Sequence, residues 1–186
     1  MWIVLLIVAV LVVLVIGMYN GLVRLRVRAD NAWADIDVQL KRRYDLIPNV
    51  VETVKGYASH ERETLESVIA ARNQAIQAQG PEAKAQAEGV LTQTLRQLFA
   101  LAEAYPQLRA VESFTDLQQT LEEIEGAIQN ARRYYNAVVR DYNTKIAQFP
   151  SNVIANSFGF TRREFFALED DRAREAPKVE FGRDEE

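Results

Sequence analysis

Residues 2–18 read WIVLLIVAVLVVLVIGM, and this apolar stretch decides how the rest of the chain is organised. The first charged side chain is Arg24, so about 23 uncharged residues open the chain, enough to span a hydrocarbon layer of roughly 30 Å as a helix. A secretory signal would have a basic segment before a shorter apolar run and a small-residue cleavage site after it. Neither pattern is present, so we expect residues 1–23 to be an uncleaved signal-anchor that crosses a membrane once.

The residues that flank this stretch predict its orientation. Three arginines follow it, and basic flanks stay on the cytoplasmic side of a membrane. Aromatic rings favour the headgroup region, and Trp2 and Tyr19 lie near the two ends of the span. We therefore expect an inner-membrane protein with its N-terminus outside and its remaining domain in the cytoplasm, and with these membrane-interface residues: Trp2, Tyr19, Arg24, Arg26 and Arg28.

Composition excludes several classes of protein. The chain has 22 basic and 26 acidic residues and a net charge of −4, which lacks the positive excess that nucleic-acid binding requires. It contains no cysteine and a single histidine, His60, so disulfides, thiolate nucleophiles and the usual zinc sites are excluded. Hydrophobic residues make up 48% of the sequence, enough for a sizeable core.

Four amphipathic helices are expected between residues 24 and 150. Apolar side chains at spacings of three and four mark a first helix that ends near Ile47. Pro48 lacks a backbone donor, so we interpret it as a tight turn into the second helix, with a kink as the alternative. The apolar periodicity of the second helix ends before the Gly80-Pro81 break, and a third helix is expected from Pro81 to near Tyr105.

The fourth helix has the most regular pattern in the chain. We expect it to begin at a cap formed by Ser113, or by Thr115 with Gln118, and to reach about Phe149, a length of roughly 50 Å. Its apolar positions recur without interruption: Phe114, Leu117, Leu121, Ile124, Ile128, Ala131, Tyr135, Val138 and Tyr142.

Long amphipathic helices with short connections bury their apolar sides most simply side by side. The sequence therefore predicts an all-α fold: a single N-terminal transmembrane helix, residues 1–23, followed by an antiparallel four-helix bundle of coiled-coil character, residues 24–150. Residues 151–186 are expected to form an irregular C-terminal tail that is partly docked and then mobile.

Several long runs resemble the LemA family of bacterial membrane-anchored proteins. They are DIDVQLKRRYDLIPNVVETVKGYASHE at 35–61, AEAYPQL at 102–108, ARRYYNAVVRDYNTKIAQFPSN at 131–152 and APKVEF at 176–181, in the order that the family uses. The resemblance covers nearly the whole chain. It implies an N-terminal membrane helix with a cytoplasmic four-helix domain, and it brings no assigned reaction.

The first candidate for partner binding is a dense charge cluster: Asp35, Asp37, Lys41, Arg42 and Arg43. It could bind anionic lipid or an acidic partner. The alternative is an ordinary solvated helix face in which Asp37 and Lys41 pair at i,i+4. Distance from the span, about 27 Å for Lys41, weakens the lipid version.

A second candidate is a Tyr-Asn pair that recurs after seven residues, at 135–136 and 142–143. It could line a polar pocket. We favour core positions for Tyr135 and Tyr142, with Asn136 and Asn143 supplying the hydrogen bonds that buried polar atoms need. The neighbouring Arg132 and Arg133 are candidate partner-binding residues too, and could pair with acids of the second helix such as Glu61, Glu63 or Glu66.

The search for catalytic chemistry finds no convergent reactive groups. His60 with Glu63 offers at most two metal ligands, and the glycines are too isolated for a phosphate-binding loop. We expect no catalytic residue, no metal site and no cofactor. Near the C-terminus, Val179 and Phe181 lie in a short peptide, PKVEF, that could dock on a partner in an extended conformation.

These features favour a non-enzymatic, membrane-anchored helical scaffold that recruits a still unidentified protein partner or further copies of itself. Gly17 and Gly21, four residues apart near the end of the span, are compatible with a homo-oligomer. The alternative is a protein that binds lipid surfaces or remodels membranes. The net negative charge of the chain disfavours this alternative.

Overall fold

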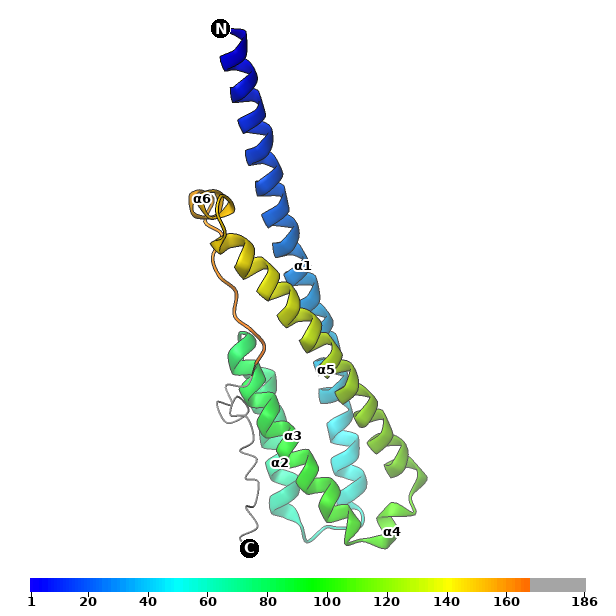
Figure 1. The fold of residues 1–186 in the computed structure, drawn as a ribbon. Coiled ribbons are helices and arrows are strands. Elements are labelled where there is room, and N and C mark those ends of the chain that lie inside the picture. Colours follow the sequence, from blue (N-terminus) through cyan, green and yellow to red (C-terminus); the bar gives the residue numbers. More distant parts are fainter. Residues whose placement is uncertain (168–186) are drawn as a thin grey trace, which may run out of the picture.

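The computed structural model describes residues 1–167, and these residues form helices and connecting segments without strands. The helices are α1 (Trp2–Lys55), α2 (Arg62–Gln77), α3 (Pro81–Glu103), α4 (Pro106–Arg109), α5 (Glu112–Ala147) and α6 (Ser151–Ser157). Figure 1 shows α1 as one long rod whose N-terminal part projects beyond all other elements.

The projecting part of α1 is the apolar stretch predicted to span a membrane. Its most apolar window has a mean hydropathy of 3.1, and none of that window is buried against other parts of the protein. An isolated apolar helix of this length in water would be costly, whereas in a bilayer its backbone is satisfied and its side chains are solvated by lipid. The helix then continues without interruption past Arg24 into the folded domain.

The turn predicted at Pro48 is wrong, because α1 runs through this residue to Lys55. A proline inside a helix leaves the carbonyl four residues earlier without its usual donor, here the carbonyl of Tyr44. The structure supplies another donor: Nε of Arg72, on α2, lies 2.7 Å from the Tyr44 carbonyl oxygen. The true break comes later, at residues 56–61, so Val50, Val51 and Val54 belong to α1 and not to the second helix.

The other predicted helix boundaries are closer to the structure. Gly80 has a positive φ of 81°, and Pro81 opens α3, as the Gly-Pro pair indicated. The α5 helix ends at Ala147, but it begins at Glu112, so the capping predictions at Ser113 and Thr115 are wrong. Its N-cap is Val111, which makes no side-chain cap bond and packs against the core between buried Leu108 and Phe114.

Two hydrophobic clusters hold the helices together. The larger one extends from Ala29 on α1 to Phe166 in the last described segment, and it includes most of the apolar positions of α2, α3 and α5. α5 packs along α1, and α2 packs along α3 (Figure 1). The smaller cluster lies where α1 leaves the apolar stretch, and it consists of Leu22, Tyr142, Ile146, Ala155 and Phe160.

The sequence predicted an irregular tail beyond Pro150, and this prediction is wrong for the first residues of the tail. Residues 151–157 form α6, with Ser151 and Ala155 buried against α1 and α5. Residues 160–167 then run in an extended path alongside α5 (Figure 1). The candidate residues Val179 and Phe181 lie outside the described part of the chain.

Candidate functional site

A buried charge centre joins α1, α3 and α5. Arg43 is only 4% exposed, and its guanidinium lies 2.9 Å from the Glu88 carboxylate, 3.1 Å from the Glu125 carboxylate and 2.9 Å from the Thr92 hydroxyl. Glu88, 6% exposed, also accepts a hydrogen bond from the Tyr44 hydroxyl. The interpretation of Arg43 as part of a solvated face is therefore wrong.

The environment of this centre shifts the pKa of two of its members, Glu88 and Tyr44. Burial raises the pKa of Glu88, although the Tyr44 hydroxyl and the Arg43 charge oppose that change. Burial and the hydrogen bond to Glu88 raise the pKa of Tyr44, so its hydroxyl remains a donor at physiological pH. Because one cation faces two carboxylates from different helices, the centre fixes how these helices meet.

The repeated Tyr-Asn pair on α5 binds the extended segment 160–167. The Asn143 amide donates to the Arg163 carbonyl at 2.9 Å and accepts from the Arg163 N–H at 2.9 Å. Asn136 makes the same two bonds with Phe166, at 3.0 and 2.9 Å. The asparagines therefore supply hydrogen bonds to partly buried polar atoms, and these atoms are backbone groups of this segment.

Side chains complete the docking of this segment. Tyr135 and Tyr142 are buried core residues, as expected, and the Tyr135 hydroxyl donates to the Glu164 carbonyl at 3.0 Å. The Phe166 ring lies edge-on to Trp33 of α1, with ring centroids 5.7 Å apart. Arg132 donates to the Phe166 carbonyl at 3.0 Å, where the sequence had suggested an acid of the second helix.

Removing both asparagine side chains should release this segment. We expect the double variant N136A/N143A to raise deuterium exchange of the Arg163 and Phe166 amides about tenfold or more, because each amide loses its acceptor. The Arg163 carbonyl also loses its asparagine donor, and the Phe166 carbonyl keeps Arg132. Exchange measured by mass spectrometry checks this, with N130A on the exposed side of α5 as the control. Unchanged exchange in the double variant would contradict the docking role.

The remaining members of the charge cluster lie on the surface. Asp35, Asp37, Lys41 and Arg42 are exposed, and Lys41 pairs with Asp45 at 2.7 Å rather than with Asp37. Arg42 bonds to Gln39 and Arg133 to Asn130 on their own helices. Among the predicted partner-binding residues, those that the structure leaves accessible are therefore Asp35, Asp37, Lys41, Arg42 and Arg133.

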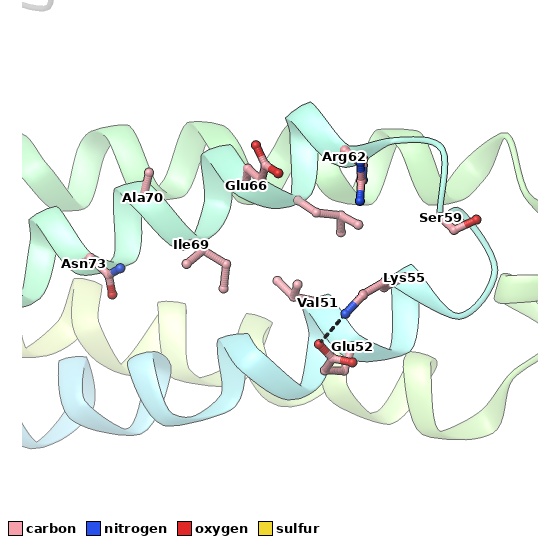
Figure 2. A pocket seen from close by; sticks show the side chains of 10 residues that line it. Val51, Glu52, Lys55, Ser59, Arg62, Glu66, Ile69, Ala70 and Asn73 are labelled. Atoms are coloured by element: carbon pink, nitrogen blue, oxygen red, sulfur yellow. Dashed lines mark hydrogen bonds and ion pairs between the residues drawn. The ribbon is translucent and has the colours of Figure 1, made fainter.

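A groove lies between the end of α1 and α2, far from the apolar stretch. Figure 2 shows Val51 and Ile69 facing each other across it, and buried Leu65 adds to the apolar floor. Charged residues of both signs form its rim, and among them Lys55 and Glu52 pair at 3.2 Å. Sequence periodicity could not find this groove, because it assigned Val51 and Leu65 to one helix.

The residues predicted to lie at a membrane interface all belong to the N-terminal half of α1. Trp2 is exposed at the tip of α1, and Arg24, Arg26 and Arg28 are exposed where α1 enters the domain. Tyr19 packs against Phe158, with ring centroids 4.9 Å apart. Within residues 1–167, α1 is the one helix long and apolar enough to cross a membrane, and it supports membrane association of the protein.

Comparisons with known proteins identify the family of this chain. The family model described as "LemA family" matches residues 32–181. Two relatives from Paramagnetospirillum magneticum, magnetosome proteins MamQ 1 and MamQ 2, are 25% identical over 174 residues. MamQ of Magnetospirillum gryphiswaldense is 24% identical. Each alignment covers 80% of this chain and 64% of the relative, so the chain spans less than two thirds of these relatives' length. Because the family model covers most of the sequence and the sequence motifs occur in the family's order, this chain belongs to the LemA family.

Proposed function

We propose that this protein is a non-enzymatic, membrane-anchored helical scaffold at the cytoplasmic face of a bacterial inner membrane. The observation that carries the proposal is the continuity of α1, which joins the apolar stretch to the core of the domain without a flexible linker. Such a helix couples the orientation of the domain to that of the span. Relatives named as magnetosome proteins support an association with membranes.

The proposed arrangement is an antiparallel four-helix bundle formed by α1, α2, α3 and α5. Short connections support it, since residues 56–61 join α1 to α2 and residues 78–80 join α2 to α3. The exposed arginines that follow the span, Arg24, Arg26 and Arg28, support the cytoplasmic side for this bundle.

The groove between α1 and α2 is the proposed partner-binding surface. Its apolar floor of Val51, Leu65 and Ile69 and its rim of mixed charge suit an amphipathic helix of a protein partner. Confinement to the membrane face raises the effective concentration of neighbouring proteins, so modest contacts in the groove suffice for assembly.

Photo-crosslinking in living cells tests this proposal. A photoreactive amino acid at Ala70, on the groove rim, should give a reproducible crosslinked species, whereas the same group at Ala137, an exposed alanine on α5, should not. A crosslink to another protein would identify the partner, and a dimer of this chain would indicate a homo-oligomer. Equal crosslinking from both positions, or none, would contradict the scaffold; products with lipid alone would favour the alternative of a lipid-binding protein.

A further inference from the structure

A long uncharged segment surrounds α6. Residues 146–161 contain no acidic or basic side chain, although 26% of the whole chain is charged. Lys145 precedes this segment and Arg162 follows it. An uncharged segment with exposed apolar residues can lie in a membrane interface, where basic residues at its ends meet the lipid headgroups.

The segment contacts α1 on the membrane side of the first charged residue of that helix. The Phe158 and Phe160 rings lie 4.9 and 5.7 Å from the Tyr19 ring. Tyr19 precedes Arg24 by five residues, about 7.5 Å along the helix. When Arg24 lies among the headgroups, whatever packs on Tyr19 must therefore lie at headgroup depth or deeper.

This segment also exposes large apolar side chains. Phe149 is 82% exposed, Phe158 58% and Val153 54%. Figure 1 shows α6 beside α1 at the end of the domain from which the apolar stretch projects. Buried contacts hold it there, since Leu22 of α1 packs with Ala155 and Phe160 in the smaller core cluster.

We propose that residues 148–160, with α6 at their centre, form a second membrane contact that lies in the headgroup layer beside the span. Lipid is the occupant of the exposed apolar surface, because Phe158, which is part of that surface, packs on partly exposed Tyr19 in the apolar stretch of α1. Two exposed arginines lie beside it and can pair with lipid phosphates: Arg26, whose guanidinium is 5.6 Å from the centre of the Phe160 ring, and Arg162, which follows the segment in the chain. This inference rests on the membrane span of α1, and it is independent of any partner in the groove.

Spin-label depth measurements on the full-length protein test this contact. The chain has no cysteine, so single variants V153C and F149C can each be labelled at one position. V38C is the matched control: Val38 is 57% exposed on α1, about 21 Å beyond Arg24. The proteins are placed in vesicles of phosphatidylcholine and phosphatidylglycerol, and collisions with oxygen and with a water-soluble nickel complex are measured.

We expect collisions with the nickel complex at positions 153 and 149 to be lower than at position 38 by roughly threefold or more, with higher oxygen collision rates. Equal collision rates with the nickel complex at all three positions would place α6 in water and overturn the proposal. Dipolar broadening at position 153 that disappears on dilution with unlabelled protein would show that a second copy covers the surface, which also overturns it. Because purified protein and lipid suffice, failure of this contact is distinguishable from failure of the scaffold.

Discussion

Replacing Arg43 with methionine is expected to lower the free energy of unfolding of the helical domain by about 3–5 kcal/mol. The substitution leaves Glu88 and the inner oxygen of Glu125 without their cation, and Glu88 is almost fully buried. Chemical unfolding of the full-length protein in detergent, followed by circular dichroism, measures the change. R42M provides a matched control, because Arg42 is the exposed neighbour and its loss should cost less than about 0.5 kcal/mol.

The loss of unfolding free energy in R43M should also depend on pH. Burial already raises the pKa of Glu88 in the folded protein, and removal of Arg43 takes away a charge that lowers it. A carboxyl with a raised folded-state pKa binds its proton more tightly when folded, so its contribution is fully present below the unfolded pKa of about 4.3 and is lost as pH rises through the folded pKa. R43M should therefore be less destabilised at pH 5 than at pH 7.5.

A second substitution separates charge from packing at this centre. Adding E88Q to R43M removes the more deeply buried of the two carboxylates left without Arg43, so we expect the double variant to recover part of the stability and to lose most of the pH dependence. If R43M alone were no less stable than R42M at pH 7.5, the buried centre would not contribute to the fold.

The second large effect is expected at Arg72, which satisfies the carbonyl that Pro48 leaves without a helical donor. R72M should lower the free energy of unfolding by about 1.5–3 kcal/mol, the range for a lost hydrogen bond from a charged group. In a P48A background the restored N–H of residue 48 can bond to the Tyr44 carbonyl, so the same substitution should cost at least about 1 kcal/mol less. Four unfolding experiments complete this double-mutant cycle, and strictly additive losses would show that Arg72 does not compensate for the proline.

The sequence predicted helices well where local periodicity decides the outcome. The Gly80-Pro81 break and the apolar side of α5 are local features, and the structure has them within a few residues of the expected positions. Pro48 was misinterpreted because the donor that allows the helix to continue lies on another helix. A long-range hydrogen bond of this kind leaves no trace in the spacing of neighbouring residues.

The buried charge centre did leave a signal in the sequence. Glu88 stands in the apolar stripe of α3, three residues from Ala85 and from Leu91, and Arg43 stands similarly between Leu40 and Ile47 on α1. A charged residue at a core position on each of two helices indicates a buried pair. The docking asparagines were harder to predict, since an extended segment beside a helix has no periodicity of its own.

The unbroken course of α1 has a mechanical consequence. Transmembrane helices change their tilt as bilayer thickness changes, over a range of roughly 0–40°. From Arg24 to Lys55 this helix is about 47 Å long, so a change in tilt of about 20° would displace its far end sideways by roughly 16 Å. The groove lies at that end, so in the proposed scaffold the thickness of the surrounding lipid would set which neighbours the groove can reach.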